Sequence, residues 1–353
     1  MIEMNSAREL TARGTYFSAK LSFLQFLAAI MVVAIHTTTV SFKNHIPENI
    51  FEQIQYLGFV NISAWAVPFF FASSAFMLFR SYKLADTKTV YTKKALRLCW
   101  PFVIWSMLYE TLSVGNEILT GNQYVFNAKD TVINILFYKG NAALWFLPML
   151  VLCTLLCPLI YLMLKNKKIG VVVLIAAAAV NFVPAVPAGV HPDALLFYMF
   201  GAYMGMHYTE NVAKKNKKGV AAVFLAIFIA ESILYSFTEG TFVGRNTVHR
   251  MILLISVWFI PDLLKKIPRH RYYDVTYFIY LFHIFVMYCL NISLRPIYNI
   301  ITNNSAPLNL LLLYFAKIAV TVLISTAVGC FIKKHIKWLW TLLTGEDVAA
   351  VKK

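Results

Sequence analysis

The chain is built from long apolar runs separated by short polar connections. About ten runs can be marked, and each approaches the ~20 apolar residues that a helix needs to cross a hydrocarbon core about 30 Å thick. They cover approximately residues 21–41, 57–79, 97–119, 142–164, 169–188, 193–209, 219–238, 246–264, 273–294 and 308–332. This pattern predicts an all-α, polytopic integral membrane protein with about ten transmembrane helices.

Basic residues alternate from one polar connection to the next. With the N-terminus in the cytoplasm, 25 of the 32 Lys and Arg residues fall on the cytoplasmic side, and Lys317 falls inside a run. The other six face outward: Lys43, Lys129, Lys139, Arg245, Arg250 and Arg295. Cytoplasmic loops of membrane proteins carry such an excess of positive charge. The alternation predicts a cytoplasmic N-terminal segment at 1–20, a transmembrane domain at 21–340 and a cytoplasmic tail at 341–353.

Composition agrees with a membrane protein and excludes a soluble domain. Charged residues make up 14% of the chain, against about 25% in soluble proteins, and hydrophobic residues make up 59%. The formal net charge of +16 follows the predicted topology, so it does not indicate a nucleic-acid partner. The five cysteines lie in apolar runs without metal-ligand spacing, and we expect no metal site.

The stretch from Lys20 to Thr38 places a histidine deep in the predicted first span. His36 lies about 24 Å along the helix from Lys20, near the far side of the hydrocarbon core. An ionisable side chain at that depth is a hypothesis for a functional site. The alternative is a structural histidine that is hydrogen-bonded to a neighbouring helix.

Other ionisable residues also fall where a bilayer penalises charge. An inserted charge costs about 2.5–3.5 kcal/mol at a helix centre. The residues are Glu110, Glu231, His249, Arg250, His283 and Lys317. They either form structural ion pairs within the bundle or line a polar cavity, and as a set they favour the cavity.

Two cations stand at the base of the third predicted span. Lys94 and Arg97 are three residues apart, which places them on one helix face. Such a pair can hold a phosphorylated ligand through charge-assisted hydrogen bonds. The alternative is anchoring at the cytoplasmic surface, which explains any basic loop.

Six short patterns occur in order along nearly the whole chain. They are VVAIH ending at His36, FFFASSAFMLF in the second run, K-x-x-R at Lys94 and Arg97, LWFLPML at 144–150, FYMFGAYMG at 197–205, and YFIYLFH ending at His283. Together they resemble the integral-membrane acyltransferase 3 family, whose members also have about ten spans. Each pattern alone is short and apolar, so the resemblance rests on their order and spacing.

This resemblance implies transfer of an acyl group, usually acetyl, from cytoplasmic acyl-CoA to a hydroxyl of a cell-envelope or extracellular glycan. His36 takes the position of the family's catalytic base, and Lys94 and Arg97 take that of the donor-binding pair. A carboxylate, Glu110 or Glu231, would tune the base. We expect a plasma-membrane protein of bacterial type, with acyl-CoA as a donor substrate and no permanently bound cofactor. We assign substrate binding to Gln25, Trp145, His283 and Arg250.

The sequence departs from the family pattern mainly in the first span. The family commonly has an acid and an arginine fourteen and eleven residues before the histidine, where this chain has Ser22 and Gln25. Ala143 replaces a histidine that often precedes the LW pair, and Ser74, Ala75 and Phe76 replace an S-G-F pattern. Glutamine can orient a substrate by hydrogen bonds, but it lacks the bidentate charge of a guanidinium.

A second hypothesis follows from these departures. One branch of the superfamily is the membrane half of membrane-bound serine racemases, whose first span also resembles VVAIHT. In that branch the membrane part is thought to supply an amino acid to a racemase domain, which we do not expect in this sequence. The alternative function is therefore a small-solute transporter, or a membrane subunit that works with a separate enzyme.

Overall fold

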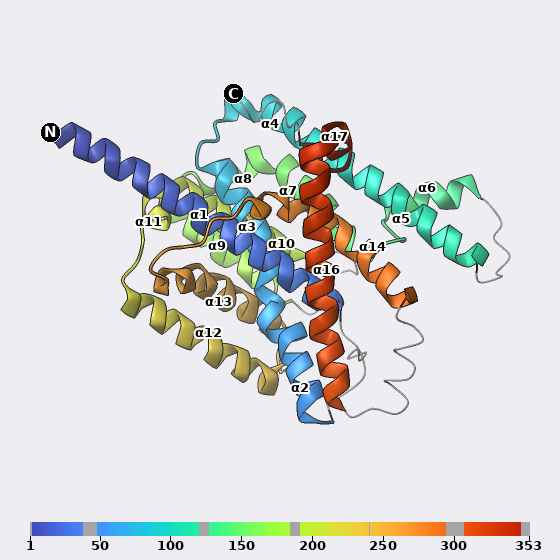
Figure 1. The fold of residues 1–353 in the computed structure, drawn as a ribbon. Helices are drawn as coiled ribbons and strands as arrows, with labels where there is room; N and C mark the ends of the chain where they lie inside the picture. Colours follow the sequence, from blue (N-terminus) through green and yellow to red (C-terminus); the bar gives the residue numbers. More distant parts are fainter. Residues whose placement is uncertain are drawn as a thin grey trace.

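The structure is a computed structural model that describes residues 2–37, 48–119, 127–183, 191–239, 241–293 and 307–346. The described residues form helices and turns without a strand, which confirms the all-α prediction. The helices, labelled as in Figure 1, are α1 (Ile2–His36), α2 (Ile50–Tyr56), α3 (Ala66–Phe79), α4 (Thr87–Lys94), α5 (Trp100–Leu119), α6 (Ala128–Leu136), α7 (Phe146–Leu155), α8 (Cys157–Leu164), α9 (Lys167–Val180), α10 (Pro192–His207), α11 (Thr209–Ala213), α12 (Lys218–Thr238), α13 (Arg245–Phe259), α14 (Thr276–Ser293), α16 (Pro307–His335) and α17 (Lys337–Thr344).

The chain is a multi-pass membrane protein. Within the described residues, five helical segments are long and apolar enough to cross a membrane: Gly14–His36, Ile62–Phe79, Lys218–Thr238, Arg271–Ser293 and Leu308–His335. The bent pair Ala142–Leu155 and Cys157–Leu164 makes a sixth if it is one span. Each of the ten predicted apolar runs is mainly helical where it is described. Residues 38–41, 184–188 and 294 of these runs, and 120–126 of the predicted outer loop, lie outside the described residues.

A proline explains the break between α7 and α8. The two helices meet at 59°, and Pro158 occupies the first turn of α8. Proline has no N–H to continue the hydrogen-bond ladder, and its ring clashes with the carbonyl of the preceding turn. An apolar run that reads as one span is therefore divided into two helices.

Glycines bring α3 and α10 into close contact. A Cβ atom on Gly201 would lie 2.1 Å from the Ala72 carbonyl oxygen, and one on Gly205 would lie 2.7 Å from that of Phe76. Helices in membranes associate through small residues at this four-residue spacing, because the backbones can then approach closely. The F-G-A-Y-M-G and F-A-S-S-A-F patterns are thus the two sides of one helix contact.

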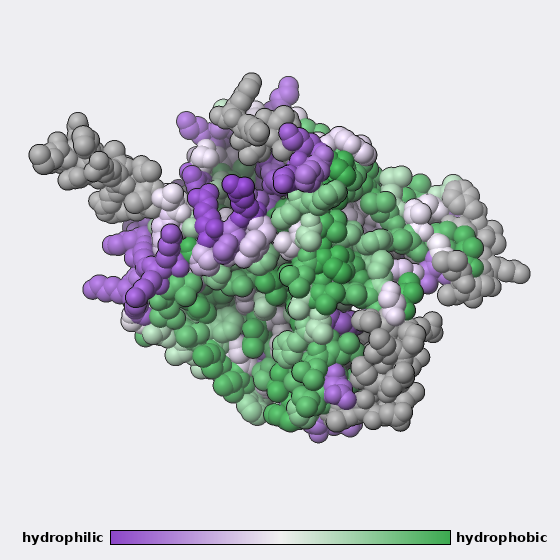
Figure 2. Space-filling view, in the orientation of Figure 1, coloured by the Kyte–Doolittle hydropathy of each residue, from purple (hydrophilic) through white to green (hydrophobic). Residues whose placement is uncertain are grey.

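Helix α1 runs through the bundle and packs against α3, α14 and α16 (Figure 1). It starts at Ile2, so the predicted N-terminal segment at 1–20 continues directly into the first span. Figure 2 shows hydrophobic surface over α12, α13 and α16, with hydrophilic residues gathered at the edge near α4 and α11. This division of the surface is what a bilayer requires of the protein.

Candidate active site

The C-terminal end of α1 brings the predicted base next to a second histidine. His36 is the last residue of α1, and its ring centroid lies 5.4 Å from that of His283 on α14. His36 is exposed, whereas His283 is fully buried. The two predicted site residues therefore share one site, in which the exposed ring can reach a ligand and the buried ring is held in place.

His283 carries a ring nitrogen without a protein partner. Its Nδ1 lies 2.7 Å from the Tyr280 carbonyl oxygen, and Nδ1 must donate this bond because a carbonyl can only accept. Nε2 of the neutral ring is then an acceptor, and this buried atom has no hydrogen-bond partner among the described residues. Leaving such an atom unpaired is costly unless water or a ligand supplies the donor. His283 thus offers a lone pair beside His36.

Tyr109 fixes the conformation of α14 on both sides of His283. Its hydroxyl donates to the Leu281 carbonyl oxygen at 2.8 Å and accepts from the Phe285 N–H at 3.2 Å. These two backbone groups are four residues apart and would bond each other in an uninterrupted α-helix. A side chain inserted into the ladder in this way bends a helix. Tyr109, from α5, is therefore a positioning residue for His283.

The two predicted donor-binding cations lie where α4 meets a π-helix. Lys94 ends α4, and Arg97 belongs to the π-helix Ala95–Cys99, a geometry that is frequent at functional sites. Lys94 lines a cavity of about 140 Å³ with Tyr91 and Thr154, whereas Arg97 is exposed. Burial, with a smaller contribution from the charge of Arg97, lowers the pKa of Lys94. The two cations are thus close enough for the charge of Arg97 to act on Lys94.

Helix α14 connects these cations with the histidine pair. The Tyr277 hydroxyl donates to the Arg97 carbonyl oxygen at 3.1 Å. His283 follows Tyr277 on the same helix, six residues later, which is roughly 9 Å along its axis. Helix α14 therefore contacts the segment that holds the two cations and itself carries His283, which lies next to the predicted base on α1.

Trp145 sits in a short 3₁₀ helix, Ala142–Trp145, that is tied to the same region. The Tyr280 hydroxyl donates to the Ala143 carbonyl oxygen at 2.8 Å. The Trp145 ring is half-buried, with its centroid 4.2 Å from that of His191. The structure places Trp145 on an element anchored beside His283, and it adds His191, which the sequence analysis did not single out.

Glu110 is buried on α5 next to Tyr109. Its Oε1 accepts a hydrogen bond from the Asn134 Nδ2 at 2.8 Å, which ties α5 to α6. Among the described residues this amide is its side-chain partner, and no contact with His36 is present. A role for Glu110 in tuning the base remains a prediction.

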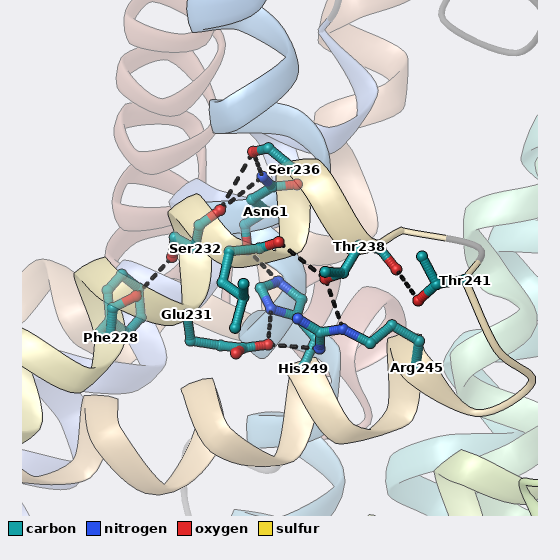
Figure 3. Close-up of polar contacts among 10 residues, drawn as sticks. Asn61, Phe228, Glu231, Ser232, Ser236, Thr238, Thr241, Arg245 and His249 are labelled. Atoms are coloured by element: carbon teal, nitrogen blue, oxygen red, sulfur yellow. Dashed lines mark hydrogen bonds and ion pairs between the residues drawn. The ribbon is translucent and has the colours of Figure 1, made fainter.

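Glu231 forms the centre of a buried polar cluster between α12 and α13 (Figure 3). One carboxylate oxygen lies 2.6 Å from Nη1 of Arg245 and 3.0 Å from Nδ1 of His249. His249 Nε2 faces the Asn61 carbonyl oxygen at 3.2 Å, and the Tyr235 ring stacks on the imidazole at 4.0 Å. Both ring nitrogens of His249 thus face oxygen atoms, one from the Glu231 carboxylate and one from the Asn61 backbone.

This Glu231 cluster matches the structural ion-pair alternative. Its carboxylate pairs with two basic groups and is not in contact with His36 in the described part of the chain. Gly244, with φ at +87°, precedes α13 and turns the chain so that Arg245 faces Glu231. A catalytic role for Glu231 remains a prediction.

Arg250 lies on α13, and Gln25 lies on α1 well below His36. Arg250 Nη1 donates to Asp193 Oδ2 at 2.7 Å, which links α13 to the first turn of α10, while its buried Nε has no partner among the described residues. Gln25 is half-buried on α1, roughly 16 Å below His36 by helical rise. Their assignment to substrate binding is a prediction.

The buried face of α16 is unusually polar for a membrane helix. Lys317, Thr321 and Ser325 repeat every four residues and are all buried. The hydroxyls of Thr321 and Ser325 have no hydrogen-bond partner in the described residues, and Lys317 has no acidic partner there. Helix α16 packs against α14 and α1, so these groups are further buried polar atoms within the bundle.

Sequence reasoning missed the best-satisfied buried ion pair. Lys20, which was assigned to the cytoplasmic N-terminal segment, is fully buried and lies 2.8 Å from Asp262. Asp262 also accepts from the Tyr16 hydroxyl and from both nitrogens of Asn216. The available signal was an aspartate inside the predicted span 246–264, which requires a partner in a bilayer.

A comparison with protein families decides the class of the molecule. The family model described as an acyltransferase domain, acyltransferase 3, matches residues 18–330. The chain belongs to the acyltransferase 3 family. It is therefore a membrane acyltransferase that transfers groups other than aminoacyl groups. Comparisons with curated proteins and with solved structures found no match.

The family match covers all six motifs that carry the resemblance. Membership of the acyltransferase 3 family relates the histidine pair to acyl-transfer chemistry. In this pair the buried Nε2 of His283 has no hydrogen-bond partner among the described residues, and the exposed ring of His36 lies beside it. The matched region also includes Gln25 and Ser22, where this chain lacks the acid and arginine common in the acyltransferase 3 family.

Proposed function

We propose that this acyltransferase moves an acyl group, usually acetyl, from acyl-CoA to a hydroxyl of a cell-envelope or extracellular glycan. The donor approaches from the cytoplasm and its phosphates bind Lys94 and Arg97. The protein lies in the plasma membrane of a bacterial-type cell, with about ten spans and both termini in the cytoplasm. The charge alternation along the sequence supports this topology.

In the proposed reaction the acceptor hydroxyl oxygen attacks the thioester carbonyl carbon. His36 takes the hydroxyl proton as general base, the C–S bond breaks, and the CoA thiolate leaves and is protonated to the thiol. The new C–O bond makes an ester on the glycan. Nε2 of His283 orients the acceptor by accepting a hydrogen bond, while Gln25, Trp145 and Arg250 contribute to substrate binding.

The observation that carries this proposal is the pair formed by His36 at the end of α1 and His283 on α14, the helix that also contacts the Arg97 backbone. The ring centroids lie 5.4 Å apart, and Tyr277 joins the same helix to the Arg97 backbone. The histidine pair supplies a base and an unpaired hydrogen-bond acceptor, and Lys94 and Arg97 supply two cations for phosphate groups. Transfer from a phosphorylated thioester to a hydroxyl needs such groups in fixed relative positions.

The test is acyl transfer by a His36→Ala variant. We expect its rate to fall by about 10²–10⁴-fold, the usual contribution of a general base. CoA release by purified protein, with acetyl-CoA and surface glycan, measures the rate, and His270→Ala serves as a matched control because His270 is exposed at the opposite end of the bundle. Full glycan acetylation by a well-expressed His36→Ala protein would refute the assignment.

Lys317 motivates a second candidate function. A buried cation with no acidic partner among the described residues can bind a carboxylate, as transport of an amino acid such as serine would require. A partner enzyme, for example a separate racemase, would then use the solute. Uptake of labelled serine by proteoliposomes tests this function. Absence of uptake, together with CoA release in the acyl-transfer assay, would exclude it.

A further inference from the structure

A second cavity lies away from the histidine pair, between α1, α3, α10 and α13. Its volume is about 320 Å³, within the usual range for ligand pockets of about 300–1,000 Å³. The wall is mostly aromatic and aliphatic, and includes Phe17, Phe69, Phe76, Phe200, Leu254 and Trp258. A lining of this kind favours a hydrocarbon chain over a polar ligand.

Polar residues of the cavity are grouped at one end. Asn211 is exposed on α11, and Asn216 follows in the connection to α12. Asn216 is fixed there, because its backbone N–H and its Nδ2 donate to Asp262 Oδ2 at 3.0 and 2.9 Å. The cavity therefore has an apolar interior and a preformed polar mouth.

The chain around this mouth is strongly basic. Lys214, Lys215, Lys217 and Lys218 are exposed in the segment that carries Asn216. The Lys215 ammonium donates to the carbonyl oxygens of Leu264 and Lys265 at 3.2 and 3.3 Å, so exposed Lys265 and Lys266 lie on an adjoining segment. Figure 2 shows the hydrophilic edge at α11 beside the hydrophobic surface.

Charge balance at the mouth favours an anion. The nearby acid Asp262 is buried and neutralised by Lys20, and Glu210 is the exposed acid of α11. The segments around the mouth thus carry six exposed lysines and one exposed carboxylate. A ligand with an apolar chain and a negative head complements both parts of the site.

We propose that this cavity is a binding site for an anionic phospholipid. One acyl chain occupies the apolar interior, and the phosphate group lies against the lysines at the mouth. Basic pockets between transmembrane helices bind anionic lipid headgroups in this way. The lipid would fill space beside α1 and α3, and so support the helix that ends in His36. The site is independent of the acyl-transfer proposal.

The experiment measures lipid retention by the full-length protein in detergent. Phosphatidylglycerol or phosphatidylcholine is added, and bound lipid is counted by native mass spectrometry. We expect phosphatidylglycerol to bind at least tenfold more tightly. Ser73→Leu, which fills the cavity from α3, should abolish this preference, and Met204→Trp, which fills it from α10, provides a second filled variant. Size-exclusion profiles identify any variant that fails to fold.

The headgroup contact is tested with a matched pair of lysine variants. Lys217→Gln with Lys218→Gln should weaken phosphatidylglycerol binding by about tenfold or more, since each lysine contributes roughly fivefold near an anionic headgroup. The control is Lys88→Gln with Lys93→Gln, two exposed lysines on α4, which should bind like the parent.

Three results would overturn the proposal. Equal binding of phosphatidylcholine would show that the lysines do not select an anion. Unchanged phosphatidylglycerol binding in folded Ser73→Leu and Met204→Trp proteins would show that the chain does not enter this cavity. Displacement of phosphatidylglycerol by stoichiometric decanoyl-CoA would show that the cavity instead takes the chain of an acyl donor.

Discussion

At the level of single residues, the buried polar groups divide into paired and unpaired sets. Glu231, Asp262 and Asp193 each have a basic partner within the bundle. Nε2 of His283 and the hydroxyls of Thr321 and Ser325 have no partner among the described residues. Unpaired buried polar atoms are expensive, so they mark the region where a ligand or water completes the hydrogen bonds. The unpaired atoms named here lie on α14 and on α16, two helices that pack together, and His283 is the one next to His36.

Tyr109→Phe tests the positioning of His283. The Leu281 carbonyl and the Phe285 N–H would then bond each other directly, and the ring of His283 would move with the altered helix. We expect a roughly tenfold loss of kcat and a shifted pH profile of kcat/KM, because the base would meet a displaced partner. Tyr161→Phe is the control, since Tyr161 packs against Tyr82 on the far side from α14.

A purely structural role for Tyr109 predicts a different result. Loss of the hydroxyl would then lower the thermal stability, by about 1–2 kcal/mol, and leave the pH profile unchanged. Stability is followed by thermal unfolding in detergent and activity by CoA release, so the two effects can be separated.

At the level of elements, the contact of α3 with α10 is the tightest of the glycine-mediated helix contacts. The backbone approach at Gly201 leaves no room for a methyl group, because the nearest atoms belong to the Ala72 backbone, which cannot rotate away. The helices would have to separate, and both of them line the apolar cavity, while α3 also packs against α1.

Gly201→Ala should therefore destabilise the protein by about 3 kcal/mol or more, the upper part of the range for overpacking. Gly115→Ala is a matched control, since no atom lies within 4 Å of its added Cβ and alanine favours the helix by up to about 1 kcal/mol. Thermal unfolding of the two variants provides the measurement. A Gly201→Ala protein as stable as the parent would show that the two helices are not so closely packed.

At the level of the whole molecule, one buried ion pair joins distant parts of the chain. Lys20 and Asp262 are 242 residues apart, and both side chains are fully buried. The Lys20 ammonium also lies 4.6 Å from the Trp258 ring centroid. The pair connects α1 to the end of α13 and, through Asn216, to the mouth of the apolar cavity.

Lys20→Met should cost about 3–5 kcal/mol, because it leaves the Asp262 carboxylate buried without its counter-ion. The double variant Lys20→Met with Asp262→Asn should recover part of this loss, since the uncompensated charge is gone while Asn216 and Tyr16 can still bond the amide. Thermal unfolding in detergent, with reduced protein yield as a second readout, measures both. Equal stability of the single and double variants would mean that the pair is not buried.

Residues alone predict much of this protein because the bilayer imposes simple rules. A membrane helix must be apolar and satisfy its own backbone, so the apolar runs that contain His36 and His283 can be recognised as helices. The spacing of Lys94 and Arg97 identifies them as a basic pair on one helix face, and the ordered motifs identify the family. All of these inferences can be made without information on which helices are neighbours.

The sequence does not reveal which polar and charged side chains pair with each other in the folded protein. Glu231 could have supported His36, yet Arg245 and His249 surround it, and Lys20 could have faced the lipid headgroups, yet it pairs with Asp262. For the same reason, the sequence did not predict that the Tyr109 hydroxyl bonds to the backbone of α14. It also did not predict that one apolar run is divided into two helices at Pro158. Hydropathy and charge depend on each residue and its neighbours in sequence, whereas a hydrogen bond or ion pair depends on distances between helices, and only the packed bundle determines those.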